Sequence, residues 1–364
     1  MSDPKKAPPL NPFTLFKRNR FAQAAGLAVV AVVLSGMVLL VPHLASHRGQ
    51  PLPSPVANAP DTTSSSPVPT ETHPTKRASP SPASKKTSLP PTTSRPGPVV
   101  SGAPHVMVIM EENKGFAATL GTCSADPYWC SLAATYASDT AWFGVSHPSE
   151  PNYVAIASGG IQGCTTDSSC AANSLTMTDL GGQLTAARIP WVAWMESMPS
   201  PCYTGGSSGG YALKHNPFGF FKDNYTGACH IQPYPGVSSV VATLGSRSAP
   251  NFVWITPNLT NDMHSGSVQQ GDAWLRANLG PVLASPWFTA GNSTVIVTMD
   301  ENDAQKSGPV PMVVISSDAR GKGSFALNGN HYGTLRALEE VFGLGLLSGA
   351  RVSVNGDLLA LFGA

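Results

Sequence analysis

Charge is scarce in this chain and evenly balanced between the two signs. Only 12% of its 364 residues are charged, with 22 Lys and Arg against 21 Asp and Glu, so the formal net charge is +1. Proteins that bind nucleic acid through its phosphates usually carry a marked positive excess. The composition therefore gives no electrostatic reason to expect a nucleic-acid partner, while 41% hydrophobic residues suffice for one large domain or two small ones.

Large apolar side chains are nearly absent from residues 45–102, where proline, serine and threonine dominate. Such a segment cannot bury enough apolar surface to offset the entropy of ordering its backbone. This absence excludes a packed core there and predicts an extended, solvated linker. We expect the folded, catalytic domain to occupy residues 103–364.

Residues 21–44 lack Asp, Glu, Lys and Arg altogether and are mostly apolar. Their number is roughly the 20 that a helix needs to cross a bilayer, whereas the apolar core of a cleaved signal peptide usually has about 7 to 15 residues. The basic tail before them, residues 1–20, keeps the N-terminus inside. We expect a single-pass transmembrane signal-anchor with the domain outside the cytoplasm; the alternative is secretion after cleavage near Ala45.

No Cys-x-x-Cys pair occurs, which argues against a cysteine-rich zinc site. All six cysteines lie in the expected folded domain, and an even number there is typical of disulfides in an oxidising compartment. Close spacing favours the first two of the following pairs and leaves the third: Cys123 with Cys130, Cys164 with Cys170, and Cys202 with Cys229.

Five short apolar runs without polar alternation predict strands that are buried on both faces, as in a parallel sheet covered by helices. They are residues 105–110, 191–194, 252–255, 294–298 and 311–315. Helix-like stretches lie between them, at residues 128–138, 178–188, 267–278 and 333–342. The expected fold class is α/β.

Polar side chains follow the ends of these runs, and open α/β sheets bind ligands at the carboxyl ends of their strands. Glu112 and Asn113 follow the first run, and Asp300 and Glu301 follow the fourth. Burying such charges is costly unless a cation pairs with them, and oxygen ligands suit a hard or borderline divalent ion. These four residues are therefore candidate metal ligands; a solvated acidic turn is the alternative for Asp300 and Glu301.

Ser149 lies between Pro148 and Pro151, at the expected start of a helix. Backbone N–H groups and the helix dipole favour a phosphate there, so the position suits a nucleophile that attacks phosphorus. The alternative is that the hydroxyl caps the helix, which is the commonest role of a serine in that place. His147 beside it is interpreted as an orienting hydrogen-bonding residue.

Asp262 and His264 stand two residues apart after the third run, and His331 comes directly before the last expected helix. A histidine that titrates near neutral pH can protonate a leaving oxygen or bind a second metal ion. The alternative for each histidine is a structural role.

Seven short segments, taken with their order and spacing, carry a family resemblance. They are residues 111–113, 147–153, 211–215, 261–264, 271–275, 300–303 and 331–332. From about residue 103 to residue 344 the chain resembles the bacterial and fungal phosphoesterase family of secreted acid phosphatases and phospholipases C, and within it most closely the mycobacterial secreted acid phosphatases. The resemblance implies an alkaline-phosphatase-like core with a mixed, mostly parallel sheet flanked by helices.

The resemblance also implies roles for individual residues. One divalent metal ion would be held by Glu112, Asn113, Asp300 and Glu301, with a second ion as an option. Ser149 would form a phosphoseryl intermediate, while His264 and His331 would bind phosphate or serve the leaving group. Asp262 would orient His264 or join the second metal site, and Lys214 and His215 would line the substrate pocket. The chain departs from the family pattern at Ser265, where family members usually have aspartate. The missing carboxylate would weaken a second cation site.

We therefore expect an extracytoplasmic, metal-dependent phosphoesterase of the acid-phosphatase type that hydrolyses phosphate monoesters. Its substrates would be phosphorylated small molecules or lipid headgroups, with the membrane contacted through the N-terminal anchor. The alternatives are a phospholipase C-type phosphodiesterase and an inactive binding module on the same fold. The completeness of the serine and carboxylate set argues against the inactive module.

Overall fold

The computed structural model describes residues 103–303, 308–318 and 321–362. The predicted tail, anchor and linker, residues 1–102, lie outside the described residues. Within the described ranges, no helix combines the length and the apolar character that crossing a membrane requires.

The strands of the described domain form one mixed sheet in the order β4-β3-β5-β1-β6-β7-β2-β8, with β9 paired to β2. Their bounds are β1 (His105–Glu111), β2 (Ala137–Phe143), β3 (Trp191–Met195), β4 (Ile231–Pro233), β5 (Phe252–Thr256), β6 (Ser293–Met299), β7 (Val310–Ser316), β8 (Gly323–Phe325) and β9 (Gly329–Asn330). Neighbouring strands are parallel except where β7 pairs with β6 and with β2. The expected mixed, mostly parallel sheet is confirmed.

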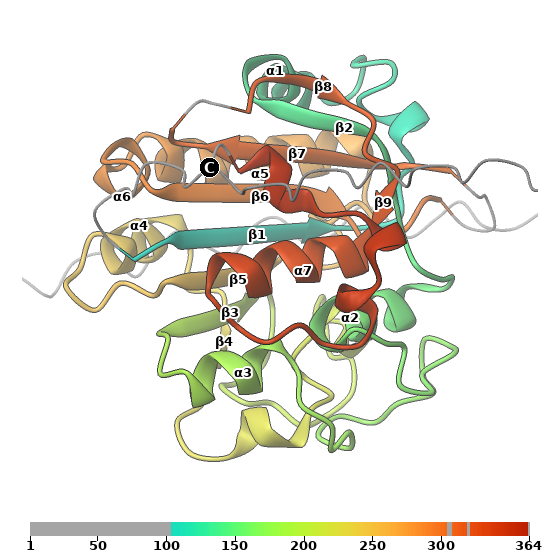
Figure 1. Cartoon of the computed structure of the whole chain (residues 1–364), viewed down its shortest axis with the longest axis vertical. Helices are drawn as coiled ribbons and strands as arrows, with labels where there is room; N and C mark the ends of the chain where they lie inside the picture. Colours follow the sequence, from blue (N-terminus) through green and yellow to red (C-terminus); the bar gives the residue numbers. More distant parts are fainter. Residues whose placement is uncertain (1–102, 304–307, 319–320, 363–364) are drawn as a thin grey trace, which may run out of the picture. The chain divides into compact units, whose positions relative to one another are not determined.

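The five predicted strands are all present, as β1, β3, β5, β6 and β7. Every residue of β5, β6 and β7 is buried, as expected for apolar runs that do not alternate with polar residues. Strand β1 lies between β5 and β6 and is parallel to both (Figure 1). Its register pairs Glu111 with Met299, so the segments that begin at Glu112 and Asp300 leave the sheet side by side.

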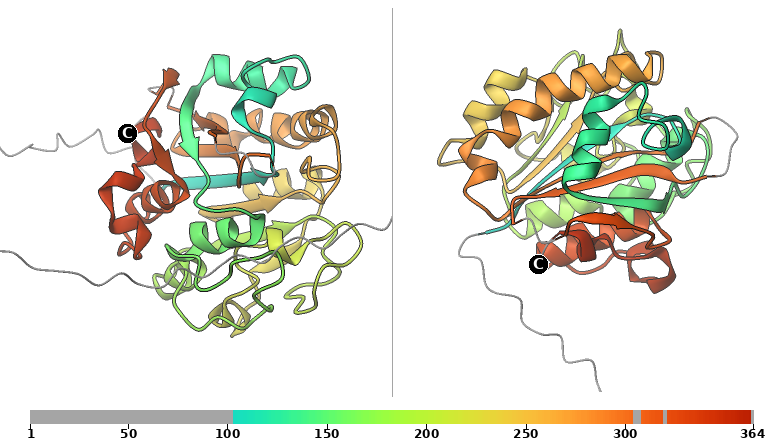
Figure 2. Two further views of the ribbon diagram at one scale, coloured as in Figure 1. Left: turned by 90° about the vertical axis from the view of Figure 1, so that its right-hand side faces the viewer. Right: turned by 90° about the horizontal axis from the view of Figure 1, so that it is seen from above.

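Helices cover both faces of the sheet (Figure 2). One face carries α1 (Pro127–Thr135), α4 (Val237–Leu244), α5 (Val268–Leu283) and α6 (Pro286–Thr289), and the other carries α2 (Ser149–Ser158) and α7 (His331–Val341), with α3 (Leu180–Ala186) packed against α2. Single 3-10 turns are η1 (Phe116–Ala118), η2 (Leu213–His215), η3 (Lys222–Tyr225), η4 (Gly349–Arg351), η5 (Ser353–Asn355) and η6 (Leu358–Leu361). The arrangement is the three-layer α/β architecture expected from the sequence.

One predicted helix was wrong at its end. Residues 136–138 were expected to continue α1, but the helix ends at Thr135 and Ala137 begins β2, which pairs antiparallel with β7. The strand was not predicted because β2 contains polar residues. One of them, Asp139, is buried and accepts from the backbone N–H groups of Ala141 and Leu327. A buried acid satisfied in this way has no signature in hydrophobic periodicity.

The three disulfides are those expected: Cys123–Cys130, Cys164–Cys170 and Cys202–Cys229. No cysteine of the described residues is left free. The zinc alternative for the cysteines is therefore excluded.

Candidate active site

Strand β1 ends in two consecutive glutamates that are both fully buried, Glu111 within the strand and Glu112 directly after it. The backbone N–H of Glu112 donates to the carbonyl oxygen of Asp262 at 2.7 Å. This bond fixes the end of β1 to the loop after β5. Glu112 then directs its carboxylate toward α2, where Ser149 Oγ donates to its Oε2 at 3.0 Å.

Ser149 is the first residue of α2, and every residue of that helix is buried. Pro148 is the N-cap and makes no side-chain cap bond. Instead of capping, the Ser149 hydroxyl lies between two carboxylates, 3.0 Å from Glu112 Oε2 and 3.4 Å from Glu301 Oε1. The capping interpretation does not fit this geometry, because the hydroxyl proton is directed to a carboxylate.

Asp300 and Glu301 follow β6 and are 0% and 4% exposed, so they do not form a solvated turn. Asp300 Oδ1 accepts from the backbone N–H of Asn113 at 3.3 Å, whereas its Oδ2 is buried with no hydrogen-bond partner among the described residues. Glu301 Oε2 lies 2.7 Å from Nδ1 of His147, which fits the orienting role expected of that histidine. The side-chain oxygen of Asn113, a fourth expected ligand, accepts from Lys114 Nζ at 2.9 Å.

The segment from Asp262 to His264 is a tight turn after β5. Asp262 Oδ1 accepts from the backbone N–H of His264 at 2.8 Å, and Met263 between them has a positive φ of 76°. Such a backbone costs about 1–3 kcal/mol for a residue with a side chain, so the surroundings must hold it. Met263 is fully buried and packs against Gly271 of α5, where any Cβ would overlap it.

Glu196, directly after β3, organises the same loop. Its carboxylate accepts from the backbone N–H of Asn258 at 2.9 Å, from Asn261 Nδ2 at 2.9 and 3.1 Å, and from Trp274 Nε1 at 3.2 Å. Glu196 is not among the site residues predicted from the sequence, although it directly follows a predicted strand. The signal that could have found it is that position, which it shares with Glu112 and Asp300.

His215 is 2% exposed and lies at the centre of the site. Its Nδ1 lies 3.1 Å from Asp262 Oδ2, and its ring stacks on Tyr153 at 5.4 Å between centroids. Burial lowers the pKa of His215 well below its usual range, so the ring is neutral and donates from Nδ1. Its Nε2, with a lone pair, then faces Glu112 Oε1 at 3.1 Å, and neither atom has a hydrogen bond within the described part of the chain.

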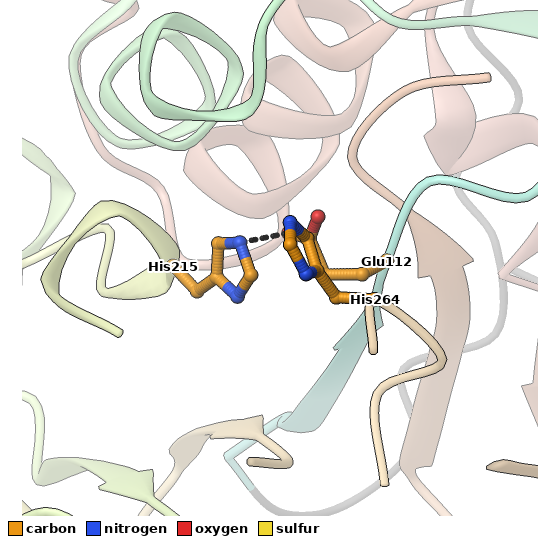
Figure 3. A group of neighbouring side chains, drawn as sticks. All are labelled: Glu112, His215 and His264. Atoms are coloured by element: carbon orange, nitrogen blue, oxygen red, sulfur yellow. Dashed lines mark ion pairs between the residues drawn. The ribbon is translucent and has the colours of Figure 1, made fainter. Parts of the chain in front are cut away.

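Glu112, His215 and His264 can each bring one ligand atom within 4.8 Å of the other two. Figure 3 shows the imidazole of His215 facing the carboxylate of Glu112, with the ring of His264 beside them. A carboxylate and two imidazoles are a donor set that suits zinc and related ions. This grouping shares only Glu112 with the four metal ligands expected from the sequence.

Lys214 precedes His215 in η2, and its Nζ lies 2.8 Å from Asp167 Oδ2 and 3.1 Å from His264 Nε2. Burial, followed by the charge of Lys214, lowers the pKa of His264 to about 4, so this ring is neutral and accepts from Lys214. Its Nδ1 lies 3.3 Å from Oγ of Ser265, the residue that departs from the family pattern. Asp167 was missed from the sequence, because nothing in a polar loop indicates that it reaches the site.

His331 begins α7 and is fully buried beneath Asp300. Its Nε2 donates to the Asp300 carbonyl oxygen at 2.7 Å, and burial lowers the pKa of the ring to about 4. The structure thus brings Ser149, the carboxylates, Lys214, His215 and His264 together. His331 reaches them through the backbone of Asp300.

The carboxylates of the site share an unusual electrostatic state. Burial, and then the charge of Asp300, raises the pKa of Glu112 well above its usual range and that of Glu301 to about 9. Burial likewise raises the pKa of Asp262 and of Asp300 to about 7. So many carboxyl groups in a buried space require either protons or a cation, and a divalent cation fits the oxygen atoms that lack hydrogen bonds.

Comparison with known proteins agrees with this chemistry. The family model described as the Phosphoesterase family matches residues 124–345. A phosphatidylinositol-3-phosphatase of Mycobacterium tuberculosis is 34% identical over 247 residues, which are 66% of this chain and 77% of that protein. The chain belongs to the phosphoesterase family. The family resemblance predicted from the sequence is confirmed, and the chain is a phosphoric ester hydrolase.

More distant relatives share a smaller part of their length. A phosphate-repressible acid phosphatase of Penicillium chrysogenum is 32% identical over 171 residues, so the match spans 45% of this phosphoesterase and 40% of the fungal protein. Among solved structures, a protein in the alkaline phosphatase superfamily from Vibrio parahaemolyticus is 13% identical, with a TM-score of 0.49 over 71% of this chain and 69% of that one.

Proposed function

We propose that this phosphoesterase is a metal-dependent phosphomonoesterase in which Ser149 is the nucleophile. The observation that supports the proposal most directly is the placement of the Ser149 hydroxyl at a buried helix start, 3.0 Å from Glu112 Oε2. The positive end of the helix dipole favours a phosphate there. The nucleophile Ser149, its proton acceptor Glu112 and a site that favours an anion therefore lie at the same place.

We assign one divalent cation to Glu112, Asn113, Asp300 and Glu301. A second ion would be held by His215 and His264 together with Glu112, which the two sites would share. Glu112 Oε1, Asp300 Oδ2 and His215 Nε2 support this, because they are buried and lack hydrogen bonds within the described ranges. To act as ligands, Asn113 would have to release Lys114, and His264 would have to release Lys214. A bound cation would neutralise charge on the phosphoryl oxygens and make the serine hydroxyl more acidic.

The residues of the chain divide the remaining work. As the bond from Ser149 Oγ to phosphorus forms and the ester bond breaks, the hydroxyl proton passes to Glu112, and the leaving oxygen takes a proton from solvent and departs as an alcohol. Water then hydrolyses the phosphoserine, which releases inorganic phosphate and restores the serine hydroxyl. Lys214 and His264 face the phosphate and the leaving oxygen, Asp262 orients His215 and His264, and His331 acts as a positioning residue for Asp300.

We further propose that the domain lies outside the cytoplasm, attached by the predicted anchor at residues 21–44. The three disulfides support an oxidising compartment. The full-length chain should then fractionate with membranes. Recovery of only a shortened form from the medium would refute the anchor and favour a cleaved signal.

The experiment that tests the activity is a metal analysis of the purified full-length chain, combined with a hydrolysis panel. The panel should contain soluble phosphate monoesters, a phosphoinositide headgroup and phosphodiesters. The name of the mycobacterial relative suggests the phosphoinositide headgroup. We expect a bound divalent metal and turnover of monoesters that a chelator removes and added metal restores. Faster turnover of diesters than of monoesters would favour the phospholipase C-type reaction. Full turnover in metal-free protein would refute the proposed metal dependence.

A further inference from the structure

The loop between Cys164 and Cys170 lies against the first turn of α2, directly after the proposed nucleophile. Glu150 Oε1 accepts from the backbone N–H of Cys170 at 2.8 Å and from Ser169 Oγ at 3.2 Å. In the other direction, the backbone N–H of Glu150 donates to Asp167 Oδ1 at 3.2 Å. The disulfide closes this loop, so hydrogen bonds in both directions fix a short cross-linked segment to the helix start.

Asp167 uses its second carboxylate oxygen to reach into the site. Its Oδ2 lies 2.8 Å from Lys214 Nζ, and the Asp167 side chain is 37% exposed against 16% for Lys214. Lys214 Nζ donates to the Asp167 carboxylate, so the contact is an ion pair between an ammonium group and a carboxylate. The outer partner of Lys214 is therefore Asp167.

The lysine side chain itself explains why such a partner is needed. Lysine carries a compact charge on a flexible stem, so its ammonium group is held in one place only by its contacts. Without Asp167, the ammonium group would keep the contact to His264 Nε2 at 3.1 Å but lose the shorter one at 2.8 Å. In the described part of the chain, two of its three protons are directed to Asp167 and His264. The third can serve a phosphate oxygen.

We propose that Asp167 is a positioning residue that holds the Lys214 ammonium group at the rim of the cation site, where Lys214 binds the phosphate group of the substrate. The disulfide-closed loop sets the position of Asp167 relative to Ser149. This inference rests on the proposed function. It means that a loop outside the sheet contributes to substrate affinity but not to the chemical step.

The test is Asp167→Asn in the full-length chain, with a soluble phosphate monoester as substrate and inorganic phosphate as competitive inhibitor. Because a hydrogen bond between charged groups is lost equally in the ground and transition states, KM and the inhibition constant of phosphate should rise together by about tenfold, with kcat changed less than about threefold. Asp167→Glu keeps the charge and should recover part of the affinity. The matched control is Asp223→Asn in η3, an exposed aspartate whose loss should change neither constant.

A second pair of variants tests the loop. Replacing Cys164 and Cys170 by serine should reproduce the rise in KM, whereas the same change at Cys123 and Cys130 should not. The two disulfides are matched in sequence separation, 6 and 7 residues. Equal effects of the two pairs, or a fall in kcat with unchanged KM in Asp167→Asn, would overturn the inference. A wild-type chain without turnover would instead refute the proposed function.

Discussion

The helices α5 and α2 each begin at a serine, and the hydroxyl groups of these two serines are used differently. At α5, Ser267 is the N-cap and forms a capping box, in which Ser267 Oγ accepts from Gln270 N at 3.2 Å and Gln270 Oε1 accepts from Ser267 N at 2.8 Å. At α2, Ser149 stands one position later, inside the first turn, and donates to Glu112. The first serine is exposed, and the second is buried among carboxylates.

The difference shows how a helix start becomes a site. A capping serine satisfies one backbone N–H and contributes stability, and its hydroxyl is then occupied. When proline supplies the N-cap residue, as Pro148 does in α2, the next serine is not needed as a cap and its hydroxyl remains available for chemistry. Stability at α5 and reactivity at α2 therefore require different placements of the same residue type.

Ser149→Ala should separate the two helix starts most strongly. If the hydroxyl attacks phosphorus, its removal should lower kcat on a soluble monoester by several orders of magnitude, because the covalent route is lost. Metal content and melting temperature should change little, since the carboxylates remain and no cap is removed. Near-normal turnover in a metal-loaded Ser149→Ala protein would end the nucleophile assignment.

The sequence predicted the parts of this comparison that depend on local pattern. Buried strands have continuous apolar runs, so their carboxyl ends, and with them Glu112 and Asp300, could be located without a structure. Cysteines six and seven positions apart close short loops, so those pairings also followed from spacing. The start of α2 was visible as a serine between prolines.

The remaining features of the site depend on how segments that are distant in the sequence return to the edge of the sheet. His215 lies between Glu112 and Asp262 only because the long connection between β3 and β5 returns to the sheet edge through η2. His331 looked like a site residue in the sequence, yet its Nε2 is directed to the backbone of Asp300. Side-chain direction and loop return have no periodicity that a sequence pattern could reveal.

Removal of metal should change the pH dependence of stability at the α2 site. The pKa values of Asp262 and Asp300, about 7, and of Glu301, about 9, lie above the unfolded values of about 4. The stability that these protonated groups contribute is complete below about pH 4 and is lost as pH rises through their folded pKa values. The unfolding free energy of chelator-treated protein should therefore fall between about pH 4 and about pH 9, by an amount on the order of several kcal/mol, and the melting temperature should fall with it.

Metal-loaded protein should lack the part of this fall that comes from the site carboxylates, because a cation stabilises their ionised form. Glu339 provides an internal control: burial raises its pKa to about 7, but it accepts from the Leu347 backbone in both forms and should affect them equally. The informative quantity is the difference in melting temperature between loaded and metal-free protein, which should grow with pH. A difference that stays constant would show that the carboxylates do not hold the metal.

Ser267→Ala should have the smallest effect and should act on stability alone. Loss of an exposed capping serine costs about 1 kcal/mol, measurable as a lower denaturation midpoint. Turnover should be unchanged at temperatures where the protein is folded, although Ser267 lies only three residues after His264, because the loop before α5 is held by Glu196 through Asn258, Asn261 and Trp274. A marked loss of turnover in this variant would mean that the start of α5 positions His264. The contrast between a stabilising helix start and a reactive one would then fail.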